Sequence, residues 1–409
     1  MKNIMVITSN YPINSSNSYG WFVHEISKRL KNKGFNVVSL APHYHGSRLK
    51  EYLDGVKVLR FPYFVPFSLQ KLAYGDGIPY NLKNTLARIQ VPLFFLSELV
   101  SALISVKKEN IDLINSHWLF PQGLVGAICK KVYKVPHIIT MHSSEITLLK
   151  KVPFSGVFSE FILNNSDFIV SVSRHRIEEL LECVSPSVKK KVSAKIKIFP
   201  MGVNLNICKY KNLDSLKERY GTKDKFVVLF VGRLVEVKGC EYLIQAFTNL
   251  SNKIPNIQLL IVGDGPLETS LKEMVKNLNL QDFIRFEGSV EHQIIVEYYS
   301  ICDVIVVPSI VDSLGFQEGL PVVLLEALTL GKPIISSRTK GVMEVIQENY
   351  NGILVDQKDS KQISSEILKL FENPRMIEKL SKNALESSKE YDWDIIASKY
   401  VKLIQEAIL

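Results

Sequence analysis

Cysteine is scarce in this sequence of 409 residues, and its five cysteines form no CxxC pair. That spacing argues against a zinc site or a dithiol redox site, and the number is too small for a disulfide scaffold. A secretory signal is also missing, because no basic start is followed by a long apolar run. The longest apolar stretch, residues 91–106, is shorter than the about 20 residues that a spanning helix needs. We therefore expect a protein of the reducing cytoplasm, in which residues 91–106 form either a buried or an interfacial helix.

Several familiar motifs are absent as well. No GxxxxGK[ST] occurs, which excludes a P-loop NTPase. No GxGxxG follows the first expected strand, since the run from Gly263 to Pro266 breaks that pattern, and this disfavours a nicotinamide dehydrogenase. There is no HExxH, no GxSxG and no histidine cluster of the kind that binds a metal. We expect no bound metal and no resident cofactor.

Acidic residues are few in the first half of the chain. Residues 1–205 hold 26 lysines and arginines against 13 aspartates and glutamates, whereas residues 206–409 hold 24 against 28. A nucleic acid, an anionic membrane face or an anionic small molecule would each suit such a basic half. The lysine pairs are scattered and no nucleic-acid reader module is recognisable, so we do not expect a nucleic acid as partner.

The composition is that of an ordinary folded protein, with 46% apolar and 22% charged residues. Short apolar runs alternate with amphipathic segments along the chain, which indicates βαβ units and parallel sheets. We predict strands at residues 3–8, 36–41, 113–116, 137–141, 168–171, 226–231, 258–262, 284–287, 304–308, 333–336 and 353–355. Helices are expected at residues 21–33, 123–132, 239–252, 266–278, 293–300, 321–330 and 361–372.

The same α/β pattern occurs twice, so we predict two doubly wound, Rossmann-like parallel-sheet domains that face a cleft. The boundary falls in a charged linker, which gives residues 1–203 for the first domain and 204–390 for the second. Residues 391–409 form an amphipathic helix that we expect to pack back onto the first domain. Ligands of such folds bind beyond the carboxyl ends of the strands.

The most informative segment follows the strand that ends at Pro308. A loop leads to the turn Glu318-Gly-Leu-Pro321 and then to a helix that carries Glu326. Proline suits a first helical turn, and the free N–H groups of that turn favour an anion, to which the backbone at Gly319 allows close approach. Two carboxylates beside a phosphate site make sense as acceptors for hydroxyl groups, one for a ribose and one for a sugar. The alternative is a capping glutamate followed by a solvated one.

A second segment places cations on a loop after a strand. Gly232 and Arg233 follow the strand at 226–231, and Lys238 and Gly239 precede the next helix. Arginine offers a fork of donors to phosphate oxygens and lysine a mobile point charge. Two solvated loop cations are the alternative interpretation.

Taken together, these segments resemble the family-4 glycosyltransferases of the GT-B fold, and the resemblance covers the whole chain. The family implies retaining transfer of a sugar from a nucleotide-sugar donor without a bound metal. By resemblance, Arg233 and Lys238 hold the diphosphate with help from the backbone at Gly319–Leu320, Glu326 accepts from ribose hydroxyls and Glu318 contacts the donor sugar. Gly20 lets a loop of the first domain approach the diphosphate, and His117 lies where the family often has a histidine near the reaction centre.

The chain departs from the family pattern at two places. The loop at residues 309–317 is long, and Ser143, Ser144 and Glu145 stand after His142 where the family often has glycine and aspartate. His117 and His142 have the alternative of being hydrogen-bonded core histidines. Asp392 and Asp394 resemble a metal-binding DxD, but their place at the start of the last helix favours a capping role.

The expected reaction moves a sugar from a UDP- or GDP-linked donor to a glycan or a lipid-linked acceptor in cell-surface polysaccharide or glycoconjugate synthesis. A lipid-linked acceptor would bring the basic domain to the inner face of the membrane. Lysine pairs and the aromatic stretch at residues 61–80, which we expect to be an irregular loop, would then supply a peripheral contact with anionic lipid. A nucleotide-sugar epimerase of the same fold and a non-catalytic sugar-binding protein are the competing hypotheses.

Overall fold

The computed structural model of the chain describes residues 1–13, 19–75, 77–142, 146, 155–205, 212–313 and 315–409. It divides into two compact units, the first made of Met1–Met201 with Trp393–Leu409 and the second of Gly202–Asp392. The expected boundary after residue 203 lies two residues from this division. Glu145 and its two neighbouring serines lie outside the described residues.

Unit 1 is built on one sheet, whose eight strands in the described residues have the order β3-β4-β2-β1-β5-β6-β7-β8. All neighbours pair in parallel except β3 and β4, which are antiparallel. The strands are β1 (Asn3–Ile7), β2 (Asn36–Pro42), β3 (Lys50–Leu53), β4 (Val56–Phe61), β5 (Leu113–His117), β6 (His137–Met141), β7 (Phe168–Ser171) and β8 (Ile196–Ile198).

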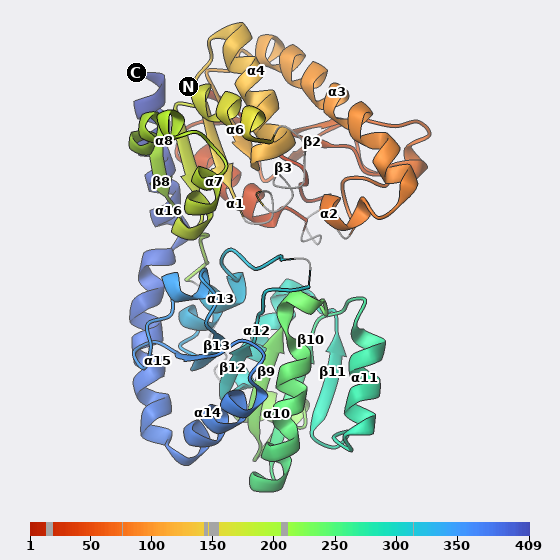
Figure 1. Cartoon of the computed structure of the whole chain (residues 1–409), viewed down its shortest axis with the longest axis vertical. Helices are drawn as coiled ribbons and strands as arrows, with labels where there is room; N and C mark the ends of the chain where they lie inside the picture. Colours follow the sequence, from red (N-terminus) through yellow and green to blue (C-terminus); the bar gives the residue numbers. More distant parts are fainter. Residues whose placement is uncertain (14–18, 76, 143–145, 147–154, 206–211, 314) are drawn as a thin grey trace. The chain divides into compact units, whose positions relative to one another are not determined.

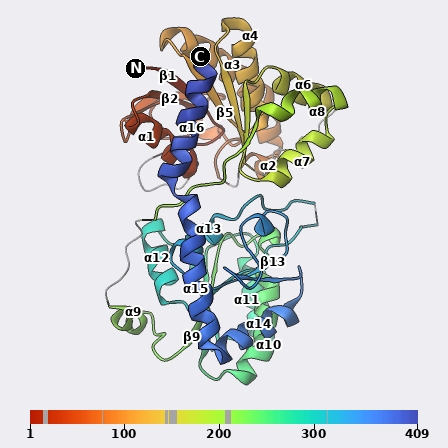
Figure 2. The same cartoon turned by 90° about the vertical axis from the view of Figure 1, so that its left-hand side faces the viewer.

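Helices cover both faces of this sheet (Figure 1). They are α1 (Trp21–Asn32), α2 (Ile78–Asn81), α3 (Thr85–Lys108), α4 (Leu124–Tyr133), α6 (Ser155–Asn164), α7 (Arg174–Glu182), α8 (Pro186–Val192) and α16 (Trp393–Ile408). On α1, Val23, Ile26 and Leu30 recur at helical spacing and are buried. This face contacts β2 and the last helix α16, which Figure 2 shows running across unit 1. The predicted packing of the terminal helix onto the first unit is therefore present.

Unit 2 repeats the plan with a parallel sheet in the order β11-β10-β9-β12-β13-β14. Its strands are β9 (Phe226–Val231), β10 (Ile257–Val262), β11 (Ile284–Gly288), β12 (Val304–Val307), β13 (Ile334–Ser337) and β14 (Ile353–Val355). Its helices are α9 (Leu213–Arg219), α10 (Cys240–Lys253), α11 (Glu268–Asn277), α12 (His292–Ile301), α13 (Val322–Thr329), α14 (Ser360–Glu372) and α15 (Pro374–Ser388). Most strand residues are apolar because helices cover the sheet, although the edge strand β11 carries Arg285 and Glu287. The apolar side chains form one core with α10 and α14.

Two expectations about unit 1 were wrong in detail. The hairpin β3–β4 was missed, although its turn is Asp54-Gly55, and both residues have the positive φ of 49° and 79° that such two-residue turns need. The aromatic stretch at residues 61–80 is largely irregular, but Phe61, Tyr63 and Tyr74 are buried in the core. These three rings therefore cannot insert into a membrane.

The apolar run at residues 91–106 belongs to the longer helix α3. In the described part of the chain, α3 alone has the length and composition of a membrane-spanning helix. It contacts α4, β2 and β4, so one of its faces belongs to the core of unit 1.

Candidate active site

Three loops of unit 2 meet at the carboxyl ends of β9, β10 and β12. Leu234 N–H donates to the carbonyl of Asp264 at 2.7 Å, and Ile310 N–H donates to the carbonyl of Val237 at 2.9 Å. The contacts are too close for side chains: a Cβ on Gly239 would lie 2.0 Å from the Pro308 carbonyl oxygen. Gly239 also has a φ of 62°, which disfavours other residues. Glycine at this position therefore allows the first and third loops to touch.

Lys238 and Glu318 form an ion pair across these loops, 80 residues apart in sequence. The second carboxylate oxygen of Glu318 accepts a hydrogen bond from the buried hydroxyl of Ser309. The two charged side chains retain only 18% and 16% of their exposure. Reduced contact with water strengthens their attraction and holds both groups in place. Two of the residues predicted to bind the donor thus lie together, and Ser309 is a partner that the sequence interpretation missed.

Arg233 lies on the same loop as Lys238. It follows Gly232 directly after β9, and its side chain is exposed. The backbone at this point is held against the neighbouring loop, since a Cβ on Gly263 would lie 2.0 Å from the Gly232 carbonyl oxygen. Arg233 is therefore presented from a rigid turn at the edge of the sheet where the ion pair lies.

The turn Glu318-Gly-Leu precedes α13, whose N-cap is Pro321, one residue before the helix begins and not in its first turn as expected. Gly319 and Leu320 are buried. The turn is held from behind by Gly341, where a Cβ would lie only 1.4 Å from the Gly319 carbonyl oxygen. The first N–H groups of a helix have no partner within the helix, so the N-terminus of α13 favours binding of an anion.

Glu326 is half-buried on α13 and accepts a hydrogen bond from Tyr299 of α12 at 2.6 Å. Burial, together with the neighbouring Glu326 carboxylate, raises the pKa of Tyr299 well above its usual value. Tyr299 therefore stays protonated and donates, which holds one oxygen of Glu326 in place. Sequence reasoning missed Tyr299, because a tyrosine in a helix between two strands resembles an ordinary core residue.

In unit 1, Gly20 forms the N-cap of α1 with a φ of 58°. A Cβ there would lie 2.5 Å from the carbonyl oxygen of Asn10, in the loop after β1. Glycine is therefore required for this loop to lie against the start of α1. Contact of Gly20 with a diphosphate stays a prediction.

His117 ends β5 and is almost fully buried. Its Nδ1 lies 2.9 Å from Nε2 of His142, and its Nε2 lies 3.3 Å from the amide nitrogen of Asn115. Thr140 in turn donates to the amide oxygen of Asn115 at 3.0 Å. This orients the Asn115 amide to donate to Nε2, so the proton of a neutral His117 is on Nδ1 and is given to His142.

Burial lowers the pKa of His117 to about 3. The pKa of His142 is lowered well below its usual value by burial and by the neighbouring His117. Both rings are therefore neutral near pH 7, and both nitrogens of His117 have protein neighbours. This arrangement fits the hydrogen-bonded core histidine that the sequence left open, and contact of His117 with a donor sugar stays a prediction.

The DxD-like pair, Asp392 and Asp394, lies at the start of α16 and not at the loops that hold Lys238 and Glu318. Asp394 lies in the first turn of α16 and pairs with Arg29 Nε of α1 at 3.3 Å. Within the described ranges, no group of three or more His, Cys, Asp or Glu side chains lies close enough to hold a metal ion.

Two parallel α/β units, with cations, carboxylates and glycine-lined loops at the carboxyl ends of one sheet, define a GT-B glycosyltransferase. Comparison with family models agrees: residues 20–207 match Glycosyltransferase Family 4, and residues 214–387 match Glycosyl transferases group 1. The chain belongs to the family-4 glycosyltransferases.

Relatives agree with this assignment, and a solved structure shares the fold. The N-acetyl-alpha-D-glucosaminyl L-malate synthase of Bacillus anthracis is 25% identical over 84% of this chain and 87% of its own. A GDP-mannose-dependent alpha-(1-6)-phosphatidylinositol monomannoside mannosyltransferase of Mycolicibacterium smegmatis is 27% identical over 62% of this chain and 66% of its own. The UDP complex of HepE from Anabaena has a TM-score of 0.74 at 18% identity, and the alignment covers 99% of this chain and 100% of that one.

Proposed function

We propose that this glycosyltransferase is a retaining, metal-independent enzyme that uses a UDP- or GDP-linked sugar and a glycan or lipid-linked acceptor. The observation that carries the proposal is the half-buried Lys238–Glu318 pair beside the turn that opens α13. A cation held there by a carboxylate lies beside a helix N-terminus, which also favours negative charge. A diphosphate is the donor group that matches both.

The positive groups act on the charge that develops during transfer. The bond between the anomeric carbon and the diphosphate oxygen breaks, and its electron pair leaves with the nucleoside diphosphate. Lys238, Arg233 and the α13 N-terminus stabilise that charge because they are oriented before the reaction begins. The acceptor hydroxyl then bonds to the same face of the sugar, and its proton goes to the departing phosphate. Fixed cations in this role would replace a metal ion.

The carboxylates have complementary roles. Glu326, held through one oxygen by Tyr299, accepts from the ribose hydroxyls of the nucleotide. Glu318 positions Lys238 and accepts from a hydroxyl of the donor sugar. His117 belongs to unit 1, where it is a buried neutral group, and a role for it in transfer stays a prediction.

The proposed acceptor follows from the charge of the chain and from the acceptors for which two relatives are named. The two relatives are named for different acceptors, a malate and a phosphatidylinositol monomannoside. Both acceptors are anionic, and the basic first half of this chain suits an anionic acceptor. Within this class our proposal is a lipid-linked acceptor at the inner face of the membrane, used in the cytoplasm for the synthesis of cell-surface polysaccharide or glycoconjugate.

The test is the transfer rate of Lys238→Ala with a panel of UDP- and GDP-sugars. Loss of one such preorganised donor costs on the order of 2.7–4 kcal/mol, so the rate should fall about 10²–10³-fold. Lys272→Ala is the matched control, because it removes a Lys–Glu pair from an exposed helix of the same unit. A folded Lys238→Ala enzyme with near-normal transfer would refute the site. Product analysis also separates transfer from isomerisation of the donor.

Metal independence has its own test. Transfer should persist in EDTA, because Arg233 and Lys238 already supply the positive charge. Loss of activity that only Mn²⁺ restores would contradict this part of the proposal and favour a metal-dependent mechanism.

A further inference from the structure

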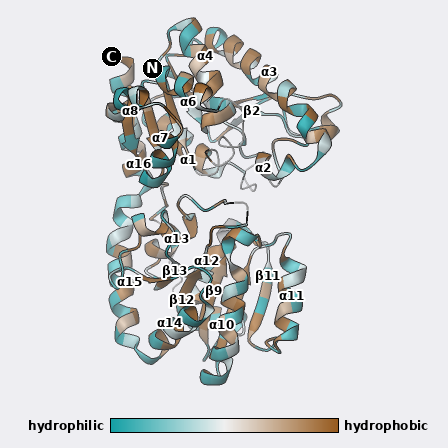
Figure 3. Cartoon of the chain, in the orientation of Figure 1, coloured by the Kyte–Doolittle hydropathy of each residue, from teal (hydrophilic) through white to brown (hydrophobic). Residues whose placement is uncertain are grey.

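Helix α3 is apolar on both of its faces. On its inner face, Ala87, Phe94, Ala102 and Val106 are buried in the core of unit 1. Its outer face is exposed and nevertheless aliphatic, as the apolar stretches of α3 in Figure 3 show. A surface helix of a soluble protein normally has a polar outer face, so an exposed apolar one requires a covering partner.

The exposed residues form one continuous line, which we call the α3 stripe. It consists of Ile89, Leu93, Leu96, Val100 and Ile104, which are between 44% and 58% exposed. At 3.6 residues per turn they lie within an arc of about 80°, and the line from Ile89 to Lys107 is about 27 Å long. The five residues of the stripe are all aliphatic.

The charges of α3 are arranged around this stripe. Arg88 lies at its beginning and Lys107 and Lys108 at its end, all three exposed. The helix has a single acidic residue, Glu98, and this residue is fully buried and accepts a hydrogen bond from Gln122 at 3.1 Å. No carboxylate of α3, whose residues are all described, is therefore presented to solvent beside the stripe.

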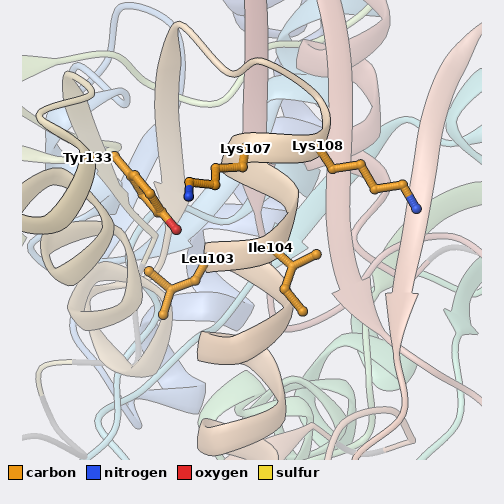
Figure 4. A pocket seen from close by; sticks show the side chains of 5 residues that line it. All are labelled: Leu103, Ile104, Lys107, Lys108 and Tyr133. Atoms are coloured by element: carbon orange, nitrogen blue, oxygen red, sulfur yellow. The ribbon is translucent and has the colours of Figure 1, made fainter.

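A hollow lies at the basic end of the stripe, lined by Leu103, Ile104, Lys107, Lys108 and Tyr133 and with a volume of about 420 Å³. Lys107 and Tyr133 point toward each other across it, whereas Lys108 extends to the other side of the helix (Figure 4). An ammonium group and a phenol hydroxyl beside aliphatic side chains form a place where a phosphate and the start of an acyl chain both fit.

The charge pattern selects among the partners that could cover the stripe. A second copy of the chain packed through the same face would set cation against cation, because both ends of the stripe are basic. A typical protein partner site has aromatic anchors at its centre, which the stripe does not have. A span across the bilayer is excluded, because the inner face of α3 packs on β2 and β4. An aliphatic line with basic ends suits the interfacial layer of an anionic bilayer.

We propose that the α3 stripe lies in the interfacial layer of an anionic phospholipid bilayer, with Lys107 and Lys108 on lipid phosphates. The proposal names the membrane-contacting surface of the enzyme. This inference rests on the proposed function in one respect: a lipid-linked acceptor is the reason that the enzyme would bind a membrane. The hydrogen bond that Gln90 of α3 donates to the Leu69 carbonyl, at 2.6 Å, holds the partly exposed Phe67 and Leu69 next to the same helix.

The experiment is flotation of the full chain with vesicles of phosphatidylcholine, with and without phosphatidylglycerol. We expect binding to the anionic vesicles only, and weaker binding in about 1 M salt, where screening acts over about 3 Å. Leu96→Glu with Val100→Glu should reduce binding at least about tenfold, because charge would enter the apolar layer. Lys107→Ser with Lys108→Ser should reduce it about fivefold per lysine.

Ile395→Glu is the matched control, because it places the same charge at an exposed apolar residue of α16 in the same unit. It should bind like the unchanged protein, and all variants should keep the same melting temperature. Equal binding by the stripe variant, no binding by the unchanged protein, or a self-associated dimer that the stripe variant dissolves would each overturn the proposal. Sugar transfer is measured on the same preparations: transfer without vesicle binding counts against the stripe alone, and binding without transfer counts against the proposed function alone.

Discussion

Acidification should destabilise unit 1 through three histidines that are buried in the neutral state. Burial lowers the pKa of His117 to about 3 and that of His137 to about 4, and it lowers that of His142 well below its usual value. An unfolded chain binds a proton at each of them near pH 6.5. Their contribution to stability is therefore complete above this pH and is lost as the pH falls toward the folded-state values.

One buried carboxyl in the same unit acts in the opposite direction. Burial raises the pKa of Glu98 to about 8, and the hydrogen bond from Gln122 lowers this pKa by less than burial raises it. The folded state thus keeps a proton that the unfolded chain releases above about pH 4.3, so this group adds stability as the pH falls from 8. Between about pH 7.5 and 5, His117 and His137 should each remove about 2 kcal/mol and Glu98 should add about 3 kcal/mol, while His142 acts in the same direction as the other two histidines. The net change in the free energy of unfolding is therefore a loss.

The assay is urea unfolding followed by tryptophan fluorescence over this pH range. The chain has three tryptophans, Trp21, Trp118 and Trp393, and all of them belong to unit 1. The signal therefore reports the unit that holds the histidines, without a contribution from tryptophans of unit 2.

Two variants test the reasoning in opposite directions. Glu98→Gln keeps the shape and a hydrogen-bonding partner for Gln122, and it should increase the loss on acidification by about 3 kcal/mol. His117→Gln should reduce the loss by about 2 kcal/mol, whereas His45→Gln, at an exposed histidine, should leave it unchanged. A pH profile that is flat in the unchanged protein, or the same in Glu98→Gln, would refute the assignment of these protonation states.

Two further predictions concern the donor site. Gly341→Ala should lower transfer about a hundredfold in a folded protein, because its Cβ would lie 1.4 Å from the Gly319 oxygen and the turn before α13 must move; full activity would show that this turn does not position the donor. Tyr299→Phe should raise the KM for the nucleotide-sugar about tenfold with little change in kcat, since Glu326 would lose the hydrogen bond that orients it. An unchanged donor KM in Tyr299→Phe would contradict a role of Glu326 at the ribose.

Much of the fold followed from local patterns. The parallel strands of both sheets are short apolar runs, and the helices between them have apolar residues at helical spacing, so both are visible in the sequence. The hairpin β3–β4 was overlooked despite its Asp54-Gly55 turn, because Lys50–Leu53 is an exposed, polar edge strand without an apolar run. Helix α15 was missed although Asn373 caps it and Pro374 begins it.

The donor site was only partly predictable. Glu318, Glu326, Arg233 and Lys238 stand in recognisable motifs at the ends of strands and the start of a helix, so their sequence neighbours indicate them. Their partners are not indicated: Tyr299 reaches Glu326 from α12, and Gly341 supports the turn from the loop after β13. Ser309 lies in the same loop as Glu318, but no motif marks it as a partner of that carboxylate. Contacts of this kind depend on how strands are ordered in the sheet, which local sequence does not encode.

Periodicity and motif spacing are properties of neighbouring residues, so the two parallel α/β units, the family and the charged residues of the donor site could be inferred from the sequence. Which side chains meet depends on tertiary packing. It set Lys238 against Glu318, enclosed His117 with His142, and turned Glu98 of α3 inward while its aliphatic residues face outward. Burial is a property of packing, and burial is what holds these histidines neutral and keeps the Glu98 carboxyl protonated.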